Sequence, residues 1–85
     1  MSTTLSTIRA FVREQGHIVD GDTLFTDDVD LLDYGYIDSF GIVALIEMIN
    51  SRFGVDLDNF DFFETGNRTI SAIAAATDAR SGQKG

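Results

Sequence analysis

Few side chains in this sequence could do chemistry, and most of those are carboxylates. The chain has one histidine, His17, and no cysteine, so it supplies neither a thiolate nucleophile nor a thiolate metal site. Fourteen Asp and Glu residues outnumber six Lys and Arg residues, which gives a formal net charge of −8. One hydroxyl also stands out, that of Ser39 in the run Gly35-Tyr36-Ile37-Asp38-Ser39-Phe40. The acids and this serine are therefore the candidate sites.

The acid-rich stretches invite comparison with a calcium-binding loop. An EF-hand loop needs oxygen ligands at positions 1, 3 and 5, glycine at position 6 and glutamate at position 12. A loop that starts at Asp28 has Leu32 at position 5, and one that starts at Asp56 has Phe60 there. Both registers fail, so we interpret these acids as solvated loop residues and expect no metal site.

The residues around Ser39 can also be compared with the motif of a hydrolase nucleophile. Ser39 and Gly41 match the second half of the G-x-S-x-G nucleophile elbow, but Ile37 stands where the first glycine is required. His17 would have to be the sole base, and no convincing alternating strand is present to launch an elbow. We therefore expect the chain not to be a hydrolase.

Size, charge and hydropathy exclude further classes of function. A chain of 85 residues forms one small domain, which cannot easily enclose a deep substrate pocket with a lid. A net charge of −8 repels nucleic-acid phosphates and favours partners with basic patches. No apolar run approaches the roughly 20 residues of a membrane span, and the first residues lack the basic start of a secretory signal. We expect a cytoplasmic monomer with no nucleic-acid partner and no membrane span.

The element that must position Ser39 is the second of three predicted helices. Apolar residues recur at helical spacing over 3–15, 39–53 and 70–80, which predicts a helix in each range. Asp38 is a good N-cap for the second helix, and Gly54 stands where a left-handed C-cap glycine belongs.

The remaining segments complete an all-α prediction. Residues 16–37 should form a long ordered loop, pinned to the core by Leu24, Phe25, Val29, Leu31, Leu32, Tyr34, Tyr36 and Ile37. Residues 59–64 could form a short helical turn with Phe60 and Phe63 on one side. The prediction is a small bundle of three main helices plus one short helix, with a domain over 1–80 and a flexible C-terminal tail over 81–85.

The start of the second helix offers Ser39 a particular setting. Its side chain lies about 60° from the centre of the buried stripe on a helical wheel, so it can point to solvent. Unpaired N–H groups and the positive end of the helix dipole suit a phosphodiester on that oxygen. Serine is nevertheless common in first turns, and the pair Asp38-Ser39 alone would indicate only a helix start.

The wider run from Leu31 to Val43 resembles the acyl carrier protein family. Members of that family have an Asp-Ser-Leu or similar triplet at the start of their second helix, usually after a glycine and an apolar residue. The same helix ends in a Phe-Gly-Val or Phe-Gly-Ile step. The matching residues are Gly35, Ile37, Asp38, Ser39, Phe53, Gly54 and Val55, and Asn59-Phe60 and Arg68-Thr69-Ile70 resemble the last connection and the last helix start.

The resemblance implies a cofactor, a function and partners. A phosphopantetheinyl transferase would move 4′-phosphopantetheine from coenzyme A onto the oxygen of Ser39, and Asp38 would cap the helix and help to orient the site. The thiol of the arm would hold an acyl or aminoacyl group as a thioester. Loading would come from an adenylate-forming ligase or an acyltransferase, and a downstream enzyme would accept the cargo. The chain would not be an enzyme but a stand-alone, non-catalytic carrier that serves its partner enzymes. The missing cysteine fits, because the cofactor supplies the sulfur.

The exposed face of the second helix departs from the pattern of carriers in fatty acid synthesis, which usually bear several acids there. The matching positions hold Gly41, Ala44, Asn50 and Ser51, so Glu47 is the single acid after Asp38. We expect a partner-binding face of Phe40, Val43, Ala44 and Met48 around Glu47, docking through shape and apolar contact. Phe40 and Val43 could instead fold back onto the long loop.

These departures favour one kind of carrier. The pattern is closer to aminoacyl carriers, including the D-alanyl type, or to carriers of peptide and polyketide pathways. The rival hypothesis is a non-carrier helical interaction module that binds a partner through the acidic loop or the exposed helix face.

Overall fold

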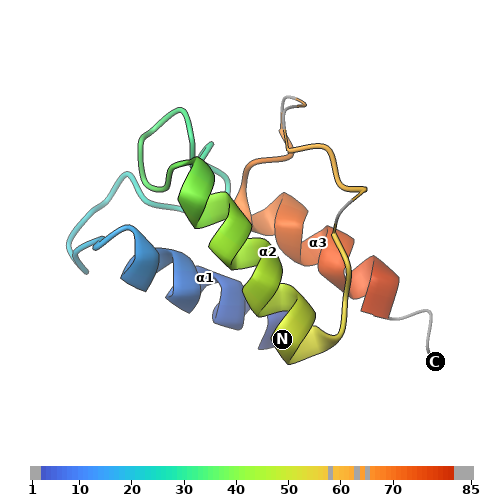
Figure 1. Ribbon diagram of the computed structural model, residues 1–85. Coiled ribbons are helices and arrows are strands. Elements are labelled where there is room, and N and C mark those ends of the chain that lie inside the picture. The colour runs from blue at the N-terminus through green and yellow to red at the C-terminus, as the bar shows by residue number, and fades with distance from the viewer. Residues whose placement is uncertain (1–2, 58, 63, 65, 82–85) are drawn as a thin grey trace.

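The structure is a computed structural model that describes residues 3–57, 59–62, 64 and 66–81. Within these residues the chain forms three helices and no strand: α1 (Thr3–Gln15), α2 (Ser39–Phe53) and α3 (Ile70–Ser81). Figure 1 shows α2 crossing in front of α1 and α3, with the long α1–α2 loop gathered at the end of the bundle where α2 begins. The predicted all-α class and the bounds of the first two helices are confirmed, and the third helix runs one residue further than expected. Residues 82–85 of the expected tail lie outside the described residues.

The helices form because their apolar residues share one face. Each helix turns its apolar side inward, so the periodicity that predicts the helices also predicts most of the core. The buried helical residues are Thr4, Ile8 and Val12 of α1, Gly41, Ile42, Leu45 and Ile49 of α2, and Ile70, Ile73, Ala74 and Thr77 of α3. Thr77 is compatible with this site because its hydroxyl donates to the carbonyl of Ile73 at 2.8 Å.

The long loop contributes some of its apolar residues to the core and leaves others exposed. Phe25, Leu31 and Ile37 of the long loop are buried as expected. Leu24 and Tyr34 were expected to pin the loop, but they are 65% and 58% exposed. Composition could not separate them from their buried neighbours, because the irregular loop has no period that assigns a face.

The expected short helix over 59–64 is not among the helices of the described residues. Its described part forms turns instead, with the N–H of Phe60 donating to Leu57 and that of Glu64 to Asp61. Phe60 and Phe62 pack edge to face at 4.8 Å between ring centroids, a contact between residues two apart that a helix does not allow. Phe63 lies outside the described residues.

One ion pair and two hydrogen bonds fasten segments far apart in the chain. The guanidinium of Arg9 in α1 donates to both carboxylate oxygens of Asp27 at 2.8 and 2.7 Å. The carbonyl of Asp27 in turn accepts from the N–H of Ser71 in α3 at 2.9 Å. The hydroxyl of Thr4 donates to Asp78 at 2.6 Å and joins α1 to α3. The middle of the loop is thus held to two helices at once, through Asp27.

Candidate functional site

Ser39 is the first residue of α2, and its side chain is exposed. Asp38 precedes it in an extended conformation, and its carboxylate accepts from the N–H of Gly41 at 2.9 Å. The carbonyl of Asp38 accepts from Ile42 at 3.0 Å. The N–H groups of Ser39 and Phe40, by contrast, have no partner among the described residues. The predicted cap is confirmed, and the helix start leaves two donors beside an exposed hydroxyl.

The chain reaches Ser39 through a short capped turn. Asp30 begins this turn, with its backbone carbonyl accepting from the N–H of Tyr34 at 3.0 Å. Gly35 ends it in a left-handed conformation, φ 74°, which glycine adopts at little steric cost. Ile37 follows and is buried. The turn therefore fixes the direction in which the chain enters α2 at Asp38.

Gly41 is buried behind Ser39, although its position was matched to an acidic, exposed site in related carriers. A Cβ on Gly41 would lie 3.0 Å from the Cβ of Ile37, tighter than side chains normally pack. Because Gly41 has no side chain, the first turn of α2 can lie close to Ile37 in the segment that precedes the helix. An acid at this position would therefore require Ile37 to shift.

An apolar groove of about 270 Å³ opens beside Ser39. Ser39 contributes the one polar side chain of its lining, and the others are Leu32, Ile42, Val43, Ile46 and Phe62. The groove lies between α2 and the two connections, so residues from three parts of the chain form it. A group attached to the Ser39 oxygen would have polar donors on one side and apolar surface on the other.

The predicted partner-binding residues divide into two sets. Phe40 is 83% exposed and Val43 is 55% exposed, and Glu47 is also exposed. Phe40 and Val43 therefore do not fold back onto the long loop. Ala44 and Met48 are half-buried, and Met48 packs against the core.

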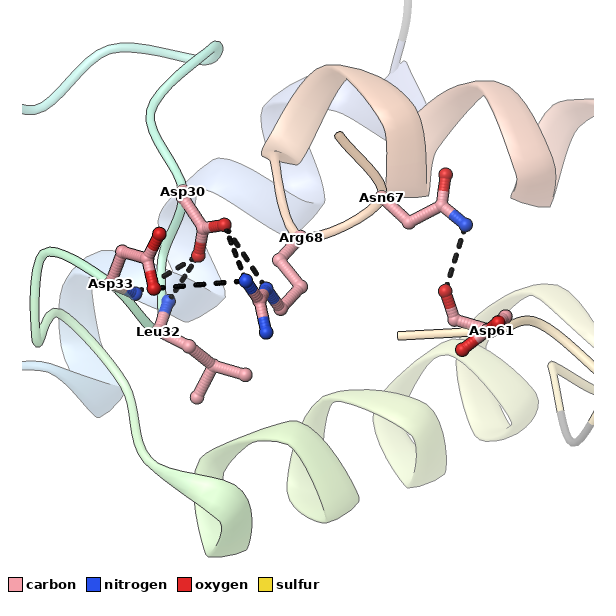
Figure 2. A network of polar contacts seen from close by, with 6 residues as sticks. All are labelled: Asp30, Leu32, Asp33, Asp61, Asn67 and Arg68. Carbon is pink, nitrogen blue, oxygen red and sulfur yellow. Dashed lines mark hydrogen bonds and ion pairs between the residues drawn. The ribbon is translucent and has the colours of Figure 1, made fainter. Parts of the chain in front are cut away.

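Sequence reasoning missed a polar network around Arg68 that lies beside this site (Figure 2). One carboxylate oxygen of Asp30 accepts from the N–H groups of Leu32 and Asp33 at 3.0 and 2.9 Å. The other lies 3.1 Å from Nε and 2.9 Å from Nη2 of Arg68. Burial alone would raise the pKa of Asp30, but the Asp33 N–H, the Arg68 guanidinium and the Leu32 N–H outweigh it and hold this pKa below its usual value.

The interpretation of all loop acids as solvated is therefore wrong for some of them. Asp30 and Asp27 are held by arginines, and Asp22 accepts from the hydroxyl of Tyr36 at 3.0 Å. In the part of the chain that is described, no group of three or more His, Asp or Glu side chains is arranged to hold a metal ion.

His17 lies two residues after the end of α1, and its backbone conformation helps to end the helix. It adopts φ 53°, the left-handed conformation that ends a helix, and the N–H of Ile18 donates back to Arg13 at 2.9 Å. Gly16, the residue directly after α1, allows a close approach of another segment, because a Cβ there would collide with the carbonyl oxygen of Tyr36. His17 therefore helps to end α1 through its backbone conformation.

A small helical bundle with an exposed serine at the start of its second helix is the arrangement of a carrier domain. The family model described as "Phosphopantetheine attachment site" matches residues 6–77, a range that extends from α1 into α3. The chain belongs to this family, and the resemblance seen in the sequence is confirmed. No curated protein and no solved structure matches the chain. In the described residues no helix is long and apolar enough to cross a membrane.

Proteins of this family carry a covalently attached 4′-phosphopantetheine group and interact with partner enzymes. The surroundings of Ser39 fit such a group on three counts. The hydroxyl is exposed, the N–H groups of Ser39 and Phe40 lie at the positive end of α2, and the groove offers apolar surface. When attached, the group supplies a thiol, which this chain lacks.

Proposed function

We propose that this chain tethers an acyl or aminoacyl group as a thioester on a 4′-phosphopantetheine arm attached to Ser39, and presents it to partner enzymes. The observation that carries the proposal is the Ser39 hydroxyl, exposed at the first position of α2. The family match supports it, since a carrier of this kind must hold the arm on a side-chain oxygen. The domain would extend over residues 1–80, and its cytoplasmic location stays a prediction.

In this proposal the chain supplies the attachment oxygen and the residues around it, and the transferase supplies the catalysis. In the transfer, Ser39 Oγ would bond to the coenzyme A phosphorus that carries the pantetheine part. The pyrophosphate bond would break, adenosine 3′,5′-bisphosphate would leave, and a base of the transferase would take the hydroxyl proton. Asp38 is engaged by the N–H of Gly41, so it orients the first turn. The free N–H groups of Ser39 and Phe40 would lie near the new phosphodiester.

Intact-mass measurement tests the attachment. Incubation with coenzyme A and a broad-specificity phosphopantetheinyl transferase should add one phosphopantetheine mass to the wild-type chain and none to Ser39→Ala. Ser51→Ala is the matched control, because Ser51 is an exposed serine on the same helix, and it should be modified like wild type. An unchanged mass with several transferases would contradict the proposal. A partner interaction that survives Ser39→Ala would then favour the non-carrier module.

The partner enzymes in this proposal are the phosphopantetheinyl transferase, an adenylate-forming ligase or acyltransferase that loads the arm, and an enzyme that accepts the cargo. They would contact the exposed face of α2, with Phe40 and Val43 at its centre, Glu47 beside them and Ala44 and Met48 at its edge. An apolar side chain as exposed as Phe40, at 83%, is the kind of residue that fills a pocket on a partner. The scarcity of acids on this face favours an aminoacyl carrier, or a carrier of peptide or polyketide assembly, over one of fatty acid synthesis.

The variant Phe40→Ser tests this docking face. Modification of Ser39 by the transferase should lose about tenfold or more in kcat/KM, because a central apolar contact is removed. Stability should change by less than about 0.5 kcal/mol, since an exposed side chain contributes little to the core. Leu24→Ser is the control, as Leu24 is 65% exposed on the long loop. Equal losses for the two variants would contradict a contact specific to α2.

A further inference from the structure

The segment that leads to Ser39 is fastened to Arg68, which lies two residues before α3 and does not line the groove. The N–H of Leu31 donates to the carbonyl of Arg68 at 2.8 Å. The carbonyl of Leu31 accepts from Tyr36 at 2.9 Å and from Ile37 at 3.3 Å. A continuous set of hydrogen bonds therefore runs from Arg68 to Ile37, two residues before Ser39.

The side chains of Arg68 and Asp30 fix the same segment a second time. One oxygen of Asp30 holds the N–H groups of Leu32 and Asp33 inside the turn, while the other binds the guanidinium of Arg68 across a separation of 38 residues. Arg68 also lies 3.7 Å from Asp33. The side chains of Arg68 and Asp30 are only 19% and 20% exposed, so water screens their attraction less than at an open surface.

Two parts of the candidate site depend on this turn. Leu32, whose N–H binds Asp30, forms one wall of the groove beside Ser39, and Figure 2 shows its side chain directed toward α2. Ile37 is buried against Gly41 in the first turn of α2. Displacing the turn would therefore move both the wall of the groove and the entry to the helix.

We infer that Arg68 is a positioning residue for the modification of Ser39, acting through Asp30 and the turn over residues 30–37. The inference rests on the proposed function, since it concerns the same attachment step. Arg68 holds the turn in the one arrangement that presents Ser39, Phe40 and the groove together. Without it, only a fraction of the molecules would present this surface to the transferase at any moment.

The variant Arg68→Gln removes the ion pair and tests the inference kinetically. If the competent arrangement falls to about one molecule in five, the KM for the carrier rises about fivefold while kcat stays unchanged, because the apparent affinity scales with the competent fraction. Arg68→Lys keeps one charged donor for Asp30 and should recover part of the loss. Asp30→Asn keeps an acceptor for the turn but loses the charge, and its KM should rise with that of Arg68→Gln.

The chain provides a matched control in Arg9→Gln. The pair Arg9–Asp27 is likewise a partly exposed ion pair between an arginine and an aspartate of the long loop, but it fastens the loop to α1 ahead of the turn. Arg9→Gln should keep the wild-type KM at a temperature where all variants are folded.

Amide hydrogen exchange supplies a readout that needs no transferase. Exchange at Tyr36 and Ile37 should accelerate in Arg68→Gln and stay at the wild-type rate in Arg9→Gln. A wild-type KM for Arg68→Gln, or an equal rise of KM in Arg9→Gln, would overturn the positioning role alone. Failure of the wild-type chain to be modified at all would instead overturn the proposed function.

Discussion

Asp38 and Ser39 are adjacent residues with different tasks at the start of α2. The carboxylate of Asp38 accepts from the N–H of Gly41 at 2.9 Å, so it is committed to the backbone. The hydroxyl of Ser39 is exposed and is not needed to start the helix. This division explains how the reactive oxygen can stay available while its helix has a fixed beginning.

Two substitutions of Asp38 distinguish the contribution of its capping hydrogen bond from that of its negative charge. Asp38→Ala should lower the free energy of unfolding by about 1 kcal/mol, because the N–H of Gly41 loses its acceptor. Asp38→Asn keeps an oxygen acceptor at the same place and should retain most of the stability. Urea unfolding followed by circular dichroism measures both. An equal loss in the two variants would show that the charge near the helix dipole, and not the hydrogen bond, is the stabilising feature.

The residues that could be predicted from the sequence are those whose partners are local. Asp38 contacts a residue three positions away, and cap chemistry acts over that range. Asp30 was interpreted as solvated because its charged partner, Arg68, is 38 residues away. Nothing in a single sequence pairs one arginine with one of several neighbouring aspartates.

The bounds of the helices could also be predicted, because they depend on residues close together in the sequence. The packing of the helix ends against other segments could not. Apolar spacing and the capping residues Asp38 and Gly54 set the limits of α2, and Gly54 adopts φ 67° as expected. At the end of α1 the left-handed position belongs to His17, and Gly16 instead makes room for the carbonyl of Tyr36. A close approach between segments is a tertiary property that local propensity does not contain.

Two glycines of the long loop should therefore respond differently to alanine. In Gly16→Ala the added Cβ would collide with the backbone carbonyl of Tyr36, so overpacking should cost about 1 to 3 kcal/mol. Gly21→Ala is the control, since a Cβ there meets no atom within 4 Å, and it should be neutral or slightly stabilising. Denaturant midpoints at neutral pH compare the two. Equal midpoints would mean that the segment carrying Tyr36 moves away at little cost.

At the scale of the whole molecule, periodicity predicted the helices but not the course of the connections. The long loop is placed by contacts that join it to α1 and to the segment just before α3, such as Arg9–Asp27 and Asp30–Arg68, which span 18 and 38 residues. The apolar anchors alone do not place it, because Leu24 and Tyr34 remain exposed. The acids of a chain with net charge −8 therefore include some that hold the fold together.

These acids give the stability of the molecule a defined dependence on pH. The bond from Arg9 lowers the pKa of Asp27 from its ordinary value of 3.8 despite partial burial, and the pKa of Asp30 is also lowered. A lowered pKa in the folded state contributes stability that is fully present above the ordinary value and is lost as pH falls through the folded value. Burial, and then the bond to Asp22, raise the pKa of Tyr36 above 10.0, so its contribution is present below that pH and is lost as pH rises further.

The free energy of unfolding should therefore be level between these two windows and fall on both sides of them. Urea unfolding from about pH 3 to pH 11 measures this profile, since stability follows the difference in bound protons between the two states. Asp30→Asn should make the acid limb shallower and leave the alkaline limb unchanged, while Tyr36→Phe should do the reverse. An acid limb of the same slope in Asp30→Asn would mean that the Arg68 pair does not hold the loop in solution, and the positioning role of Arg68 would lose its physical basis.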